Sequence, residues 1–214
     1  MRALLVLLFA LGCSSSTGRL DRSSYDLDVC KSGRWDVLGG VTVADGSYLE
    51  LDISASGTMS FTRQQMSRVG TACASASEPT TCTAALAKVT SATGWRTEQC
   101  GGAGCTTSVR WFVREKAGAF TILTRIEDLL PYLGAIDSPA KAAVVAAYRF
   151  GVDDVECSGA QVKRLADGSY EVFLAHGDSN CTDRVERRVR VLTDGTATVV
   201  ESATIPARET CVSA

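Results

Sequence analysis

Nine cysteines are distributed along this chain, and they limit its possible folds more than any other feature. The first, Cys13, directly follows a short apolar run from Ala3 to Leu11. This run is well below the ~20 residues that a membrane-spanning helix needs. Together with Arg2 it has the proportions of a secretory signal peptide. We therefore predict that the chain is exported and that its other cysteines meet an oxidising compartment.

The end of the apolar run, Ala10-Leu11-Gly12-Cys13, resembles the lipobox of bacterial lipoproteins. The resemblance implies cleavage before Cys13, a diacylglyceryl group on its sulfur and a further acyl chain, such as palmitate, on the new amino terminus. Ala10 departs from the family pattern, which more often has Leu at that position. By analogy with the family, Ser14 after the cysteine favours the outer membrane in a cell that has one. The expected partner is therefore a membrane of the cell envelope, reached through the lipid anchor.

These features predict how the chain is divided. We expect residues 1–12 to be the signal peptide, residues 13–26 to be the lipidated cysteine and a flexible Ser-rich tether, and residues 27–214 to form a single domain with a possible subdivision near 126–138. The mature chain has 21 Lys and Arg against 24 Asp and Glu, a net charge of −3. It lacks the clustered basic excess of a nucleic-acid-binding protein, so we expect no nucleic-acid partner.

An even number of cysteines after Cys13 predicts a framework of disulfides. These cysteines are Cys30, Cys73, Cys82, Cys100, Cys105, Cys157, Cys181 and Cys211. Short spacings favour Cys100–Cys105, across a glycine-rich turn, and Cys73–Cys82. Tetrahedral zinc usually takes two pairs of closely spaced ligands. Because that pattern is missing, we expect neither a metal nor a cofactor.

The remaining pairings depend on hairpin geometry. If Asp167-Gly168 is a two-residue hairpin turn, Cys157 and Cys181 lie together at the open end of that hairpin, within reach of a disulfide. The next turn along the chain would instead bring Cys181 near Cys211. We favour Cys157–Cys181, which leaves Cys30–Cys211 to join the two ends of the domain.

Alternating apolar and polar residues predict strands at 41–43, 48–53, 58–62, 108–113, 120–123, 160–165, 170–175 and 184–205, the last broken by a turn at 193–195. A helix is expected at about 82–92, with Thr81 as its N-cap. A clearer helix begins after Ser138, with Pro139 at its first position, and ends at Gly151. This pattern predicts an α+β domain in which antiparallel sheet, built from hairpins and a meander, packs with one or two helices.

The pentapeptide Ala-Asp-Gly-Ser-Tyr occurs twice, at 44–48 and at 166–170. Asp-Gly suits a tight hairpin turn because both turn positions favour positive φ. The sequences on either side of the two copies do not match. We therefore interpret the repeat as two independent occurrences of a favourable turn sequence rather than as a duplicated domain.

The short sequence motifs that could indicate a catalytic or binding site are weak evidence. Ser138-Pro139-Ala140-Lys141 has the S-x-x-K form of penicillin-recognising enzymes, but the chain lacks their other elements. We interpret it as a helix N-cap followed by a surface lysine. The basic stretch 184–190 alternates arginines with valines, as on the solvated face of a strand. Gly33-Arg34-Trp35 has the G-x-W form seen at the start of lipocalin barrels.

These observations favour a non-catalytic binding or interaction module on a membrane-anchored lipoprotein, with no catalytic residue assigned. One alternative is a lipocalin-like carrier of a small apolar ligand. Another is a small exported hydrolase in which Asp153, Asp154 and Glu156 act with His176, the single histidine.

Overall fold

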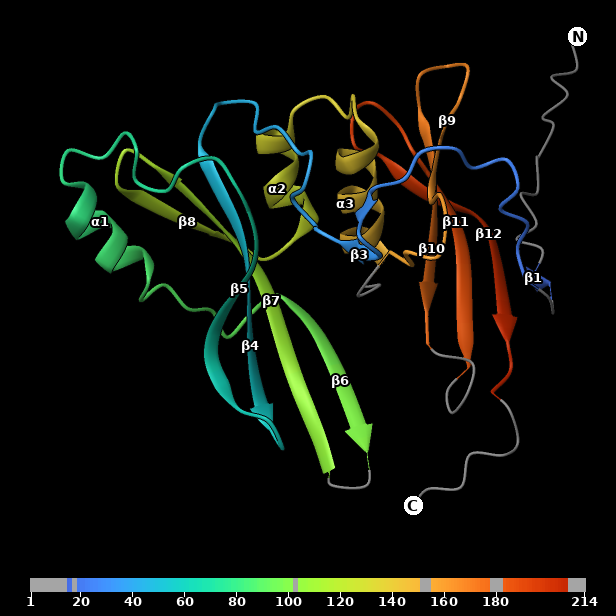
Figure 1. Cartoon of the computed structure of the whole chain (residues 1–214), viewed down its shortest axis with the longest axis horizontal. Coiled ribbons are helices and arrows are strands. Elements are labelled where there is room, and N and C mark those ends of the chain that lie inside the picture. The colour runs from blue at the N-terminus through green and yellow to red at the C-terminus, as the bar shows by residue number, and fades with distance from the viewer. Residues whose placement is uncertain (1–14, 17–18, 102–103, 151–154, 178–182, 208–214) are drawn as a thin grey trace, which may run out of the picture.

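Two antiparallel sheets form the framework of the protein (Figure 1). The computed structural model describes residues 15–16, 19–101, 104–150, 155–177 and 183–207. The N-terminal sheet has the order β5-β4-β7-β6, with β8 also paired to β7. The C-terminal sheet has the order β1-β12-β11-β10-β9, in which β1 runs parallel to β12.

The bounds of the elements follow the chain. The strands are β1 (Ser15–Ser16), β2 (Cys30–Lys31), β3 (Arg34–Trp35), β4 (Tyr48–Gly57), β5 (Phe61–Val69), β6 (Trp95–Gly101), β7 (Gly104–Lys116), β8 (Ala119–Leu123), β9 (Val162–Arg164), β10 (Tyr170–His176), β11 (Arg184–Val191) and β12 (Ala197–Ile205). The helices are α1 (Pro79–Leu86), α2 (Ile126–Leu133) and α3 (Pro139–Phe150). The α+β class and the antiparallel sheets predicted from the sequence are confirmed.

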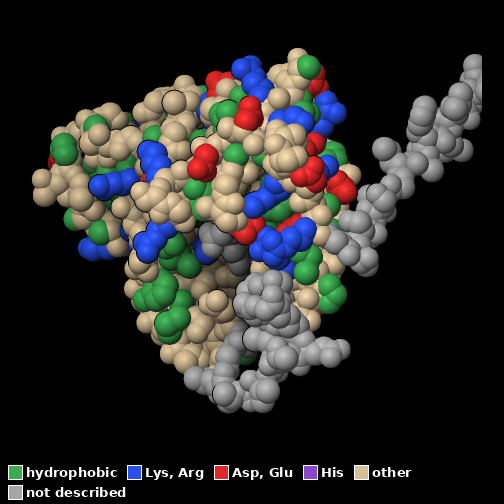
Figure 2. Space-filling model, turned by 45° about the vertical axis from the view of Figure 1, so that its right-hand side comes forward, with side chains coloured by type: hydrophobic (Ala, Val, Ile, Leu, Met, Phe, Trp, Pro, Cys, Tyr) green, Lys and Arg blue, Asp and Glu red, His purple; other side chains and the backbone are tan. Residues whose placement is uncertain are grey.

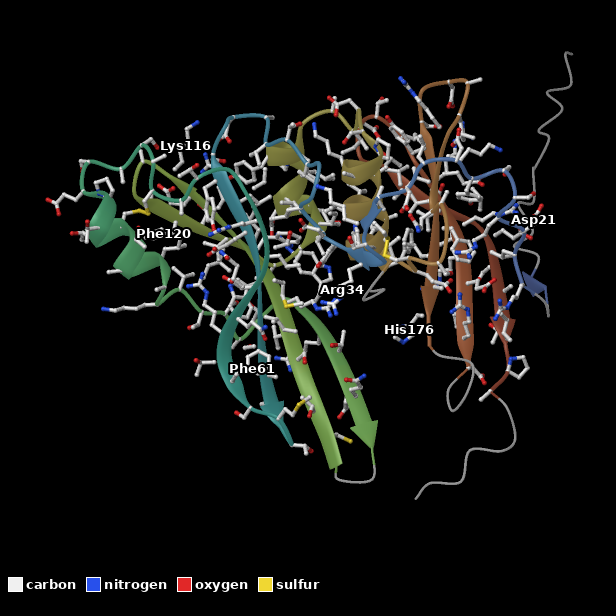
Figure 3. The ribbon with its side chains drawn as sticks, in the orientation of Figure 1. Asp21, Arg34, Phe61, Lys116, Phe120 and His176 are labelled. Atoms are coloured by element: carbon white, nitrogen blue, oxygen red, sulfur yellow. A yellow bond between two sulfur atoms is a disulfide. The ribbon has the colours of Figure 1, made fainter. Side chains whose placement is uncertain are left out.

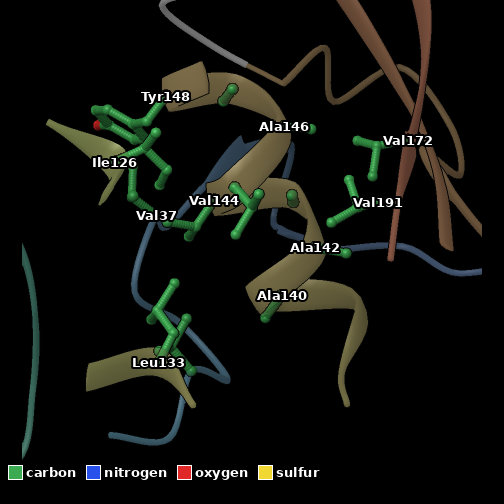
Figure 4. Packing of buried hydrophobic residues seen from close by; sticks show 14 of the residues in the cluster. Val37, Ile126, Leu133, Ala140, Ala142, Val144, Ala146, Tyr148, Val172 and Val191 are labelled. Carbon is green, nitrogen blue, oxygen red and sulfur yellow. The ribbon is translucent and has the colours of Figure 1, made fainter. Parts of the chain in front are cut away.

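Helix α3 lies between the two sheets and forms the centre of the core. Every residue from Ala140 to Tyr148 is buried. A helix that is apolar on all sides has no face that favours water, so it is stable only when it is surrounded by protein. Figure 4 shows Val172 and Val191 of the C-terminal sheet on one side of α3, with Ile126 and other apolar side chains on another.

Three aromatic rings join α3 to the N-terminal sheet. Trp95, Phe112 and Tyr148 meet edge to face, with ring centroids 4.8–5.6 Å apart. Trp95 Nε1 also donates a hydrogen bond to the Tyr148 carbonyl at 2.6 Å. This bond satisfies one of the carbonyls that the last turn of a helix leaves unpaired.

Most of the predicted elements are present, but several differ. Strand β6 lies in a segment where the sequence predicts no strand. The N-cap of α1 is Glu78, so the predicted N-cap at Thr81 is wrong. Helix α1 begins earlier than expected because Pro79 occupies a first-turn position. Helix α2 was not predicted, since it is only eight residues long and contains Pro131. Residues 41–43 do not form a strand, because Ala44 N bonds to the Tyr132 carbonyl instead of to a neighbouring strand. The strand predicted at 58–62 begins at Phe61.

The repeated pentapeptide forms the same turn twice. Each copy is held by an aspartate, a serine and an arginine from the adjacent strand: Asp45, Ser47 and Arg114 in the first copy, and Asp167, Ser169 and Arg190 in the second. In both copies the serine N–H donates to the aspartate at 3.1 Å. Only the second copy joins two paired strands, β9 and β10.

The segment expected to be a flexible tether is partly packed onto the domain. Leu20 and Tyr25 are buried with Phe173 on the face of the C-terminal sheet that points away from α3. Leu20 N donates to Glu186 Oε2 at 2.8 Å, and Tyr25 Oη donates to a glutamate of β10 at 2.8 Å. The predicted boundary at residue 27 is therefore wrong, and the packed domain includes Leu20.

Two disulfides are resolved in full, and one corrects the predicted connectivity. Cys73–Cys82 is confirmed, with a Cα separation of 5.9 Å. Cys30 is bonded to Cys157, with a Cα separation of 5.7 Å, so the predicted pairs Cys157–Cys181 and Cys30–Cys211 are wrong. Cys181 and Cys211 lie outside the described residues.

Cys157 does not lie at the open end of the predicted hairpin, because the strand before Asp167 is short. β9 extends back only to Val162, and the chain before it turns toward the N-terminal segment. Gln161 N bonds to the Leu27 carbonyl, and Val29 N bonds to Gln161 Oε1. This turn carries Cys157 to Cys30.

Strands β6 and β7 pair on either side of the glycine-rich segment in which Cys100–Cys105 was predicted. Cys100 and Cys105 are cross-strand Cα partners, and Cys105 is disulfide-bonded. The side chain of Cys100 lies outside the described part of the structure.

Peptide mapping of the unreduced protein checks the corrected pairing. We expect a crosslinked fragment that contains Cys30 and Cys157, and another that contains Cys73 and Cys82, because their Cα separations suit disulfides. A fragment that joins Cys30 to Cys211 would contradict this connectivity.

Overpacking the helix between the sheets tests the layered core. Ala146 of α3 is fully buried, so Ala146→Leu should lower the free energy of unfolding by about 1–3 kcal/mol. The matched control is Ala84→Leu on an exposed position of α1, which should change stability by less than about 0.5 kcal/mol. Urea unfolding measures both, and equal effects would contradict the buried position of α3.

Candidate functional site

The main cluster of buried ionisable side chains lies on the N-terminal sheet. Alternation along β4 places Tyr48, Glu50 and Asp52 on the same face, the one that points away from α3. Both carboxylates are buried, at 1% and 0% exposed. Arg63 and Gln65 reach them from the neighbouring strand β5. We call these five residues the carboxylate cluster.

Arg63 links both carboxylates to helix α1. Its Nε donates to Asp52 Oδ2 at 2.9 Å, one Nη donates to Glu50, and the other Nη donates to the Leu86 carbonyl at the end of α1. Buried polar groups of this kind need such partners, since an unpaired buried charge is costly. Arg63 therefore fastens the α1 segment to the sheet.

Glu50 accepts further hydrogen bonds from neutral groups. Tyr48 Oη donates to Glu50 Oε2 at 2.6 Å, and the Gln65 amide donates to the same carboxylate. Burial, followed by the hydrogen bond to Glu50, raises the pKa of the Tyr48 phenol well above its usual range. Tyr48 therefore remains a proton donor to Glu50 at every physiological pH.

The charges of the cluster balance when one carboxyl carries a proton. Arg63 is paired with both buried carboxylates, and the other guanidinium near this face, Arg68 of β5, is exposed to solvent. Burial and the neighbouring Glu50 raise the pKa of Asp52 to about 6, although Arg63 opposes the shift. Asp52 Oδ1 has no hydrogen-bond partner among the described residues. The arrangement suits a proton on Asp52.

The cluster is covered on its outer side. Leu86 packs with Trp111, Val113 and Tyr48 over this face of the sheet. The carboxylates are therefore closed off from a substrate in this conformation, although catalysis by acid pairs requires contact with one. What the cluster can do is bind and release a proton while it holds α1 in place.

The residues of the proposed hydrolase do not form a site within the described part of the chain. His176 is exposed at the end of β10 (Figure 3). Glu156 pairs with Arg22 and Arg184. Burial raises the pKa of Glu156, but hydrogen bonds from Ser158 and Arg184 outweigh this effect and hold it below its usual value. Asp153 and Asp154 lie outside the described residues.

Lys141 is not the surface lysine that the sequence suggested. It is 4% exposed, and its Nζ donates to the Ala135 carbonyl at 3.1 Å and pairs with Asp137 at 3.0 Å. Ser138 caps the helix as predicted, since its Oγ accepts from Lys141 N at 3.3 Å. The S-x-x-K motif is thus a helix start whose lysine ties the preceding loop to the helix.

Three of the four arginines in the basic stretch of β11 form ion pairs with acids. Arg184 pairs with Glu156 and Glu186, Arg188 with Glu201, and Arg190 with an aspartate of the repeated turn. On the face shown in Figure 2, basic and acidic side chains are interspersed. Such a surface has no large field of one sign.

Buried apolar side chains of the described residues pack around α3. The strands form two separate sheets with the helix between them, and this topology gives no support to the lipocalin-like alternative. Trp35 packs against the core from the short strand β3. One cavity of about 260 Å³, lined in part by Cys30, Gly40 and Pro139, lies beside the start of α3. It is smaller than the ~300–1,000 Å³ of usual ligand pockets.

One group of possible metal ligands has a structural role. Cys73, Cys82 and Glu115 have ligand atoms within 4.8 Å of one another, but the two sulfurs are bonded to each other. Glu115 accepts hydrogen bonds from Cys73 N at 2.7 Å and from Gly118 N at 2.8 Å. It holds the disulfide loop against the turn between β7 and β8.

Comparison with known proteins gives no relative. The chain matches no protein-family model, and no curated protein or solved structure is significantly similar to it. Among the described residues, no helix has the length and apolar character needed to span a membrane.

The sequence predicts strand β4 but not the carboxylate cluster that lies on it. The alternation of β4 was recognised, but polar residues on one face of a strand usually indicate a solvated face. Only the covering segment with α1 buries Glu50 and Asp52. An acid pair two residues apart, with an arginine directly after the next predicted strand, is the signal that could have indicated them.

The pH dependence of stability tests the proton held by Asp52. Its pKa is about 6 in the folded protein and near 3.8 in the unfolded chain. The stabilisation is therefore complete below about pH 4 and is lost as the pH rises through 6. Asp52→Asn should remove a decline of roughly 2–3 kcal/mol in unfolding free energy between pH 4 and pH 7.

The matched control for this measurement is Asp26→Asn, because Asp26 is exposed and outside the cluster. It should keep the pH profile of the unmodified protein in urea unfolding across this range. A profile for Asp52→Asn that declines as steeply as the control would contradict a proton on Asp52.

Proposed function

We propose that this chain is a membrane-anchored lipoprotein of the cell envelope whose domain is a non-catalytic binding module. The observation that carries the proposal is the segment Gly12-Cys13 at the end of a short apolar run, with a compact domain close behind it. The domain begins by Leu20, so Cys13 stands just before folded structure. That position suits an anchor.

The disulfides support export of the chain. Cys30–Cys157 and Cys73–Cys82 both have geometry suited to stable crosslinks, and such bonds persist in oxidising compartments. Cys30–Cys157 joins segments that are 127 residues apart. It ties the N-terminal segment, which follows the anchor, to the middle of the domain.

The arrangement of ionisable groups favours a binding role over catalysis. Glu50 and Asp52 are covered, and Glu156 is held in ion pairs. These acids are used to fasten segments to the sheets. We propose that the domain acts through its outer surface, with the outer membrane as its location where a cell has one.

Lipidation is tested by feeding cells labelled palmitate. We expect the label on the mature protein and the protein in the membrane fraction, whereas Cys13→Ser should abolish both, because the thioether to the diacylglyceryl group cannot form on serine. Cys30→Ser is not a suitable control because it breaks a disulfide. Ser14→Ala retains Cys13 and should be labelled normally. If the Cys13→Ser protein stays in the membrane fraction, the proposal is wrong.

A further inference from the structure

The distance between Cys13 and the folded domain is short. Leu20 is buried on the C-terminal sheet, and its N–H is bonded to Glu186. Seven residues span at most about 25 Å when the chain is fully extended. A lipid anchor at Cys13 would therefore hold this sheet within about 25 Å of the membrane, at most.

The pairing of β1 shortens this distance further. Ser15 and Ser16 pair in parallel with Ser202 and Ala203 of β12. Ser15 is two positions after Cys13, a reach of roughly 7 Å, and paired strands lie about 4.8 Å apart. The backbone at Ser202 would then lie within about 12 Å of an acylated Cys13.

The long axis of the molecule separates this edge from the opposite end. In Figure 1 the longest axis is horizontal, with β12 and β1 near one end and α1 and β8 at the other. A lipid surface that meets the molecule end-on at β12, across the long axis, would leave α1 and β8 at the far end. The position of β1 thus distinguishes the two ends.

We infer that the β12 edge of the C-terminal sheet rests on the lipid surface that holds Cys13, and that the end with α1 and β8 faces away from it. This inference rests on the proposed lipidation of Cys13. The contact comes from the short connection rather than from a basic patch, since Arg184, Arg188 and Arg190 of β11 are each paired with an acid. The lipid headgroups are what the β12 edge contacts. The distal end is the one left open to other partners.

Two side chains of similar exposure provide matched reporters. Val200 on β12 is 49% exposed, and Ile122 on β8 is 41% exposed. Val200 lies at a register shift between β11 and β12, where a larger side chain can be accommodated on the exposed edge. Ile122 is on the strand at the other end of the molecule.

Photocrosslinking in the full lipoprotein tests the inference. A photoreactive benzoylphenylalanine is introduced at Val200 or at Ile122, and the protein is reconstituted into vesicles of phosphatidylethanolamine and phosphatidylglycerol with a radiolabelled lipid. We expect severalfold more labelled lipid on the Val200 protein than on the Ile122 protein. Equal labelling, stronger labelling at Ile122, or no labelling at either position would overturn the inference.

A lengthened connection separates this inference from lipidation itself. A Gly-Ser insert of about 20 residues after Ser14 has an r.m.s. span of roughly 25 Å, so it should remove most of the labelling at Val200 while acylation persists. Mass spectrometry of the N-terminal peptide measures acylation in every sample. If Cys13 carries no lipid, both the proposed function and the inference fail. If Cys13 is acylated and Val200 is not preferentially labelled, the inference alone fails.

Discussion

The burial of α3 between two sheets is the constraint on which the rest of the structure depends. The helix from Ala140 to Tyr148 has no solvated face, so it is covered by the C-terminal sheet, by helix α2 and by apolar residues of the N-terminal sheet. Because each sheet contributes apolar residues to α3 from one face, its other face is free to pack with something else. The N-terminal sheet uses that face for the carboxylate cluster under α1, and the C-terminal sheet uses it for Leu20 and Tyr25.

Long-range polar contacts attach these outer segments. Arg63 connects Glu50 and Asp52 to the end of α1, and Glu115 connects the disulfide loop to the turn after β7. Buried ion pairs contribute little net stability because desolvation offsets the attraction. Their value lies in geometry, since removing one partner would leave an unpaired buried charge. They specify where segments that lack regular pairing must lie.

The N-terminal segment links the architecture to the proposed anchor. It packs on the C-terminal sheet, and Cys30 crosslinks it to Cys157. Force or motion at Cys13 would therefore be transmitted to a sheet rather than absorbed by a long loose linker. An anchor attached in this way sets which end of the domain faces the membrane.

Local patterns determined much of the secondary structure of this chain. The strands at 108–113, 120–123 and 170–175 and the helix after Ser138 follow from alternation and from helix-start residues, which act over a few positions. The Cys73–Cys82 bond also spans a short loop. Signals of this kind do not depend on what the rest of the chain does.

Only the tertiary structure decided which residues are covered and which distant segments meet. Lys141 and Asp52 have polar side chains that usually favour water, yet both are buried because other segments pack over them. Cys157 pairs with Cys30 because the chain before β9 turns toward Leu27, a contact that no local spacing encodes. Burial and long-range pairing depend on the arrangement of the whole chain, since the free energy of each contact is realised only when both segments are already in place.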